Sequence, residues 1–118
     1  MLKRILSTLF KGRPIDVPNT DQIREGSARG VTVGDLAAGG TRVLLCRVDG
    51  ALHAIDSLCP HEGGRLETGD LVDGRLARCP LHGYMFDPKN GAVKRGACAG
   101  AKTYRISEQG ANATFWIG

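Results

Sequence analysis

Aromatic residues make up only 5% of this 118-residue chain, and no apolar stretch approaches the roughly 18 residues that a transmembrane helix needs. A G-x-G-x-x-G motif following a strand, typical of nicotinamide- and flavin-binding domains, is also missing. The length leaves room for one small domain and excludes a dinucleotide-binding fold joined to a substrate domain. Redox chemistry in this chain would therefore require a small cofactor of its own.

Acidic residues are absent from residues 1–14, whereas residues 15–118 hold equal numbers of acidic and basic residues. The formal net charge of +4 therefore resides in an N-terminal arm, residues 1–14. Its apolar residues fall near helical spacing, with the basic residues on the other side. We expect a loosely docked terminus or an amphipathic helix that contacts a membrane surface or a partner through residues 1–13. The short, interrupted apolar part does not resemble a secretory signal.

Turn signals separate short β-prone runs over the rest of the chain. Glycine is abundant at 17 residues, and Asp49-Gly50 and Asn90-Gly91 are hairpin signals. About eight short strands at this spacing predict an all-β protein, an antiparallel sandwich or small barrel, as one domain over 15–118. The expected strands are 28–33, 41–48, 51–56, 75–78, 84–87, 92–94, 102–107 and 113–117.

Two segments carry the residues suited to metal binding: Cys59-Pro60-His61-Glu62-Gly63-Gly64 and Cys79-Pro80-Leu81-His82-Gly83. Their four candidate ligands are Cys59, His61, Cys79 and His82. Such a set fits a tetrahedral Cys₂His₂ zinc site, or a [2Fe–2S] cluster with two cysteines on one iron and two histidines on the other. Zinc fingers usually pair ligands of the same type, whereas each segment here mixes Cys and His. The mixed pairs favour the two-iron cluster.

The double motif CPHEGG…CPLHGYMFD resembles the cluster-binding sequence of Rieske [2Fe–2S] proteins. With the surrounding strand pattern, the resemblance covers about residues 25–118, and it places the cluster-binding part at about residues 57–100. It implies that Cys59 and Cys79 bind one iron, while His61 and His82 bind the other through Nδ1. The exposed edges of the two imidazoles would then be the exit for the electron.

The residues around the motif resemble those of the low-potential Rieske proteins. Respiratory members carry a disulfide at the positions that correspond to Gly64 and Leu81, which cannot form one here. They also place hydroxyl donors at the positions of Tyr84 and Phe86, and Phe86 has no hydroxyl. Because fewer donors leave the reduced cluster less stabilised, we expect a potential near the low end of the Rieske range, roughly −150 mV. Tyr84 is interpreted as a ring that packs in its loop.

Histidine is too scarce for a Rieske oxygenase. Such an enzyme also binds a mononuclear iron with two histidines and a carboxylate, and only His53 remains beyond the cluster motif. We therefore expect no catalytic residues and no enzyme, but a soluble cytoplasmic one-electron carrier between a flavin-dependent reductase and a terminal oxygenase. The alternatives are a Rieske small subunit of the nitrite-reductase type and an interaction domain that is stabilised by a zinc ion. No nucleic-acid partner is expected.

The remaining reactive residues are given structural roles. His53 is expected to be a strand residue, and Cys46 a buried small apolar residue. Cys98 falls in the segment that matches the third cluster-covering loop of Rieske domains, so we expect it near the cluster but not as a ligand. A group of five basic residues, called the basic group, forms either a solvated face or a docking site for an acidic partner. Its members are Lys89, Lys94, Arg95, Lys102 and Arg105.

Overall fold

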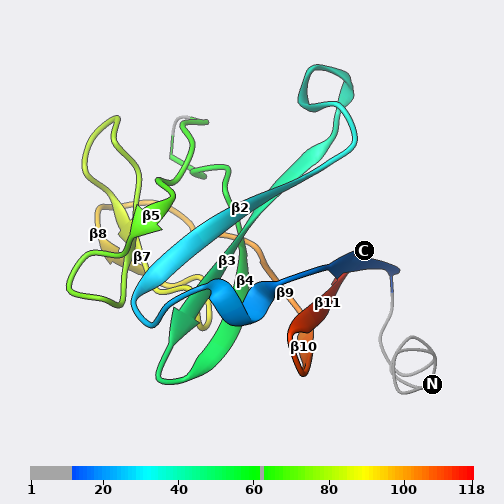
Figure 1. Ribbon diagram of the computed structural model, residues 1–118. Helices are drawn as coiled ribbons and strands as arrows, with labels where there is room; N and C mark the ends of the chain where they lie inside the picture. The colour runs from blue at the N-terminus through cyan, green and yellow to red at the C-terminus, as the bar shows by residue number, and fades with distance from the viewer. Residues whose placement is uncertain (1–11, 62) are drawn as a thin grey trace.

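The computed structural model describes residues 12–61 and 63–118, and almost all of its regular structure is β (Figure 1). The strands are β1 (Arg13–Val17), β2 (Ser27–Val33), β3 (Thr41–Val48), β4 (Ala51–Asp56), β5 (Gly69–Asp70), β6 (Ala77–Arg78), β7 (Met85–Phe86), β8 (Val93–Arg95), β9 (Thr103–Tyr104), β10 (Ile106–Gln109) and β11 (Asn112–Ile117). Two short 3-10 helices, η1 (Thr20–Gln22) and η2 (Leu36–Ala38), complete the described elements.

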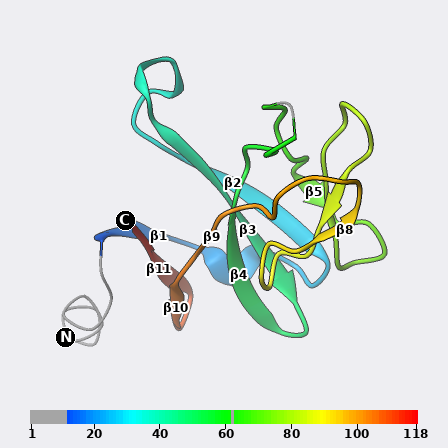
Figure 2. The same ribbon diagram turned by 180° about the vertical axis from the view of Figure 1, so that it is seen from behind.

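The strands form three antiparallel sheets, which confirms the predicted all-β class. The central sheet has the order β5-β2-β3-β4-β9, and two three-stranded sheets have the orders β1-β11-β10 and β6-β7-β8. The long β2–β3 hairpin extends away from the body, with η2 at its tip (Figures 1 and 2). The small β6-β7-β8 sheet carries the second of the two cysteine–histidine segments.

Strand β3 contributes to two separate cores, because successive side chains of a strand point to opposite faces. Leu44 and Cys46 pack in the core shared with the β6-β7-β8 sheet, whereas Val43 and Leu45 pack in the core shared with the β1-β11-β10 sheet. All four are fully buried. A strand covered on both faces needs a nearly continuous apolar run, as TRVLLCRV provides.

The strand predictions for 41–48 and 51–56 are confirmed to the residue, and Asp49-Gly50 joins them as a hairpin turn. Both turn residues have positive φ, 54° and 81°, as the expected turn type requires. The single strand predicted over 102–107 is wrong. The chain leaves the central sheet after β9 and enters the β1-β11-β10 sheet, here called the terminal sheet, at β10. The two strands β9 and β10 therefore have different partners.

Two strands were absent from the sequence prediction, β1 and β5. Strand β1 pairs with β11 from the other end of the chain, with Arg13 opposite Ile117. Pro14 is tolerated because β1 is an edge strand. The last two residues of the expected arm, Arg13 and Pro14, therefore belong to a sheet. Most of the expected arm, predicted to be a loosely docked terminus or an amphipathic helix, lies in residues 1–11, outside the described residues.

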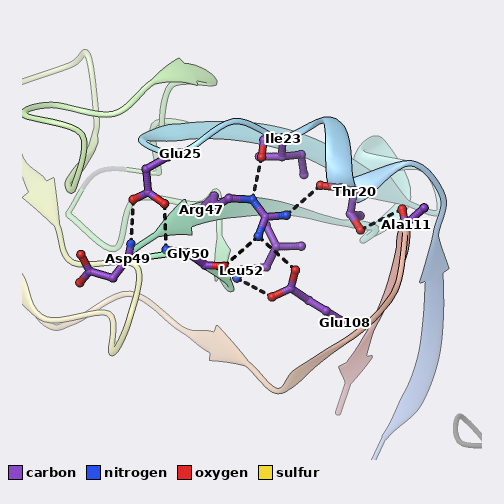
Figure 3. Close-up of polar contacts among 9 residues, drawn as sticks. All are labelled: Thr20, Ile23, Glu25, Arg47, Asp49, Gly50, Leu52, Glu108 and Ala111. Carbon is purple, nitrogen blue, oxygen red and sulfur yellow. Dashed lines mark hydrogen bonds and ion pairs between the residues drawn. The ribbon is translucent and has the colours of Figure 1, made fainter.

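The Arg47 side chain links three separate parts of the fold (Figure 3). Its Nε donates a hydrogen bond to the Ile23 carbonyl at 2.7 Å, and a second nitrogen donates to the Thr20 carbonyl at 3.0 Å. The third nitrogen forms an ion pair with Glu108 of β10 at 3.1 Å. The arginine side chain is only 15% exposed, so these contacts are largely shielded from water. They join β3 to η1 and to the terminal sheet.

Candidate metal centre

The two cysteine–histidine segments fold into loops with the same backbone hydrogen bonds. In the first loop, the Cys59 N–H donates to the Gly64 carbonyl at 2.7 Å, and the Gly63 N–H donates to the Cys59 carbonyl at 3.0 Å. In the second, the Cys79 N–H donates to the Tyr84 carbonyl at 2.8 Å, and the Gly83 N–H donates to the Cys79 carbonyl at 3.0 Å. The two loops lie side by side and project in the same direction (Figures 1 and 2).

Glycine is required at the same place in each loop. Gly63 and Gly83 have φ of 73° and 71°, in the left-handed region where a side chain is strained. Each residue follows its cysteine by four positions and turns the chain back toward it. The histidines occupy different places within these equivalent turns, because His61 follows its cysteine by two residues and His82 by three.

The four candidate ligands come together as two pairs. The Nδ1 atoms of His61 and His82 face each other at 3.4 Å. Two nitrogens bound about 2.1 Å from one tetrahedral metal ion would be about 3.4 Å apart, so the imidazoles are already spaced to share one ion. Cys59 and Cys79 are buried in the same core, and the nearby Cys59 is one of the causes that raise the pKa of the Cys79 thiol. This donor set and its division into pairs fit a [2Fe–2S] cluster, which takes two protein ligands on each iron.

No three Cys, His, Asp or Glu side chains within residues 12–61 and 63–118 are grouped to hold a single metal ion. A Rieske cluster does not require such a group, because each of its irons has only two protein ligands.

The surroundings of Cys79 have opposing effects on the pKa of its thiol. Burial is the main cause that raises the pKa of the Cys79 thiol, and the neighbouring Cys59 raises it further. The backbone N–H groups of Leu81 and His82 donate to the sulfur and partly oppose this effect. These two N–H groups are built into the loop, so they would also stabilise negative charge on a metal-bound thiolate.

The cysteines are buried, but the histidines are nearer to the surface. Cys59 and Cys79 are each 1% exposed, whereas His61 is half-buried and His82 is exposed. Leu58 and Leu81 are 45% and 54% exposed, so each of the two loops presents one large apolar side chain to solvent. The site therefore has an inner cysteine side and an outer histidine side bordered by apolar surface.

Gly64 and Leu81 face each other across the two loops, as the resemblance to disulfide-bearing relatives implied. A Cβ added at Gly64 would lie 2.8 Å from Leu81 Cδ1 and 2.8 Å from the Cys79 sulfur. The Leu81 side chain therefore covers the space that a side chain at position 64 would need.

Other residues of the sequence analysis occupy the places expected of them. Cys46 is fully buried, and burial raises the pKa of its thiol to about 12. Cys98 packs at the edge of the core that contains Cys59 and Cys79. Phe86 is fully buried in that core. His53 lies on β4, opposite Cys46 on β3.

The basic group is dispersed among separate contacts. Lys89 Nζ forms an ion pair with Asp49 at 2.8 Å, and the Lys102 ammonium lies 5.1 Å from the centre of the Tyr104 ring. Lys94 and Arg95 are exposed residues of strand β8. An acidic docking partner for this group stays a prediction.

The contact between Tyr84 and His61 was not predicted from the sequence. The two rings are stacked, with centroids 4.2 Å apart and planes 9° from parallel. Tyr84 lies two residues after His82 in the sequence, but no sequence pattern predicts which histidine an aromatic ring will cover.

Residues 13–105 match the family model described as the Rieske [2Fe-2S] domain. The ferredoxin component of a naphthalene 1,2-dioxygenase system from Pseudomonas aeruginosa is 37% identical over 100 residues, covering 81% of this chain and 88% of the relative. The chain belongs to the Rieske [2Fe–2S] domain family. It is accordingly a [2Fe–2S] protein, as the donor set indicates.

Solved structures share the fold. The ferredoxin of carbazole 1,9a-dioxygenase from Nocardioides aromaticivorans IC177 is similar with a TM-score of 0.75 and 25% identity, covering 91% of this chain and all of that one. A chain described as an NADH-dependent nitrite reductase small subunit from Mycobacterium tuberculosis has a TM-score of 0.66 at 19% identity, covering 92% of this chain and 98% of that one. The fold is therefore common to carriers and to subunits. No helix in the described part of this chain is long and apolar enough to cross a membrane.

Proposed function

We propose that this protein is a diffusible one-electron carrier that takes electrons from a flavin-dependent reductase and delivers them to a terminal oxygenase. The observation that carries the proposal is the 3.4 Å spacing of the two Nδ1 atoms, at the outer end of a site whose cysteines are buried. The ferredoxin relative of a dioxygenase system supports this role among the functions that the family serves. The cluster would supply one-electron storage and no substrate chemistry.

Four residues of this chain would hold the cluster. Cys59 and Cys79 would bind the inner iron, and His61 and His82 the outer iron through Nδ1. The two loops present these residues without large movement, because their backbone bonds and left-handed glycines fix the turns. The N–H groups of Leu81 and His82 would stabilise the Cys79 thiolate from within its own loop.

The outer face would be the contact with the oxygenase. His82 is exposed there, and the exposed side chains of Leu58 and Leu81 belong to the same two loops. Two exposed apolar side chains provide little apolar surface, which suits a complex that must form and dissociate at each electron delivery. A chain with three histidines cannot supply both the cluster ligands and a facial triad of its own, so the substrate would be oxidised in the partner.

Replacement of the proposed ligands tests the site. Cys59→Ser and Cys79→Ala should lose the two irons and two sulfides, together with much of the stability, because metal binding and folding are coupled. Cys46→Ser and Cys98→Ser are the matched controls and should keep the cluster. The measurements are iron and acid-labile sulfide content and the visible spectrum. Loss of the cluster in Cys98→Ser with retention in Cys79→Ala would overturn the ligand assignment.

A second experiment separates a diffusible carrier from a fixed subunit of another oxidoreductase. The tagged holoprotein is purified from its native host under gentle conditions and then titrated into a reductase and oxygenase pair. A free carrier should elute alone and support oxygenase turnover that saturates with its concentration. Recovery in a stoichiometric complex that survives gel filtration would instead favour the small-subunit alternative.

A further inference from the structure

The Tyr84 ring lies against one of the two histidines and not equally against both. Its plane is 9° from that of His61, with centroids 4.2 Å apart, whereas the His82 ring is 6.4 Å away and tilted by 60°. The histidine that Tyr84 covers, His61, is half-buried, whereas His82 is exposed. The contact is therefore a stack on a single imidazole.

A third segment of the chain holds the ring in this place. Gly96 has a φ of +123° and packs against the Cγ–Cδ2–Cε2 side of the Tyr84 ring. A Cβ at Gly96 would overlap Cδ2 and would lie 2.6 Å from Cγ. Only glycine permits both this backbone conformation and this approach. The loop after β8 thus contacts Tyr84, and Tyr84 contacts His61.

The ring is not needed to close the ligand loop. The bond that closes it runs from the Cys79 N–H to the Tyr84 carbonyl, at 2.8 Å, and any residue at position 84 supplies a carbonyl. The Tyr84 side chain is only partly buried and packs at the edge of the core. A replacement at this position therefore changes the contact with His61 while the backbone of the loop is kept.

We propose that Tyr84 is a positioning residue: stacked on His61 and backed by Gly96, it fixes the plane of that imidazole and keeps water from one of its faces. A parallel ring contact limits rotation of the imidazole and so holds its Nδ1 toward the Nδ1 of His82. This inference rests on the proposed role of His61 as an iron ligand. Residues that orient a ligand also tune the metal, and solvent access changes its potential.

The direction of the effect follows from charge. The reduced centre carries one more negative charge than the oxidised centre, and water stabilises that charge better than the negative face of an aromatic ring does. Loss of the ring should therefore favour the reduced state. Tyr84→Leu removes the stack, Tyr84→Phe keeps it without the hydroxyl, and Gly96→Ala displaces the ring without removing it.

The test measures iron and sulfide content, reduction potential and the electron paramagnetic resonance of the reduced holoproteins. Tyr84→Leu and Gly96→Ala should keep both irons and raise the reduced-to-oxidised ratio two- to tenfold at a fixed potential, a rise of about 18 to 59 mV. Their g values should shift, whereas Tyr84→Phe should match the original protein. If Tyr84→Leu loses iron, the reduction potential and g values of Gly96→Ala alone test the role of Tyr84.

Unchanged potential and g values in the iron-loaded variants would overturn the role of Tyr84. A shift in Tyr84→Phe equal to that in Tyr84→Leu would assign the effect to the hydroxyl and would overturn the stack. His61→Ala distinguishes failure of the ligand assignment, because full retention of iron, sulfide and spectrum in that variant would show that His61 is not a ligand, whatever Tyr84 does.

Discussion

Residues of the same type at the metal centre differ in their burial and in their contacts. His61 and His82 have the same chemistry, but one is half-buried under Tyr84 and the other is exposed. Cys59 and Cys79 are buried, as is Cys46, yet Cys46 lies on a strand and is interpreted as a core residue only. Burial raises the pKa of the Cys46 thiol to about 12, so it stays neutral and unreactive near pH 7.

Phe86 offers a test of how hydrogen bonds tune the potential. It is fully buried in the core that contains both cysteines, at a position where high-potential relatives are expected to carry a tyrosine. In Phe86→Tyr, a hydroxyl that reaches the sulfur of Cys59 or Cys79 would stabilise the reduced centre. We expect the potential to rise by some tens of millivolts, given about 59 mV for each 1.4 kcal/mol.

Protein-film voltammetry of both proteins at one pH would measure this shift. The original protein should lie near the low end of the range, roughly −150 mV. A value well above zero would contradict the low-potential assignment. A lower potential in Phe86→Tyr with the cluster intact would show that position 86 does not tune the centre in this way.

Whole elements are held together at points that strand pairing alone does not provide. Asp56, the last residue of β4, accepts hydrogen bonds from the Leu58 N–H at 2.8 Å and from the Tyr104 hydroxyl of β9 at 2.7 Å. The start of the first ligand loop is thereby anchored to the central sheet. The Arg47 contacts do the same for β3, η1 and β10 (Figure 3).

Arg47→Ala should lower the free energy of unfolding by about 3 kcal/mol, because it leaves the Ile23 carbonyl without its donor, takes a second donor from the Thr20 carbonyl and removes the cation paired with Glu108. Urea denaturation followed by the fluorescence of Trp116 would measure the loss. The reduction potential should not change, because Arg47 contacts none of the proposed ligands.

Arg75→Ala is the matched control. Arg75 also pairs with a carboxylate, that of Asp49 at 3.1 Å, but both side chains are more than half exposed. Exposed pairs contribute little, so its unfolding midpoint should stay close to that of the original protein. An equal loss in the two variants would contradict the special importance of the Arg47 contacts.

The molecule as a whole separates a charged segment from a neutral body. The net charge of +4 belongs to residues 1–14, and Arg13 and Pro14 are fixed in β1. A deletion that tests the arm should therefore stop at residue 11, since removing Arg13 would shorten a paired strand. We propose that residues 1–11 associate with an anionic surface and take no part in the redox site.

Deletion of residues 1–11 should leave the visible spectrum and the potential unchanged. It should abolish a weak, salt-sensitive association with anionic vesicles, because screening by salt weakens attraction between exposed charges. Sedimentation with vesicles of anionic lipid, at low and high salt, compares the two forms. Equal and negligible binding of both would eliminate the membrane role, and a changed potential would show that the arm reaches the site.

The sequence alone was enough to predict the central hairpin with its turn, and it identified the candidate ligand pairs. Cysteine and histidine at fixed spacing, a continuous apolar run and Asp49-Gly50 are local features, and local chemistry suffices to interpret them. It also indicated that Gly64 and Leu81 occupy facing positions, through the family resemblance.

Which distant segments meet depends on the tertiary structure. Strand β1 forms because β11 lies beside it. The run 102–107 divides into β9 and β10 because β9 pairs with β4 of the central sheet, whereas β10 pairs with β11. The stack of Tyr84 on His61 and the contacts of Arg47 likewise join residues that are more than 20 positions apart in the chain. Such contacts depend on how the whole chain closes around its two cores, which neither side-chain periodicity nor turn chemistry encodes locally.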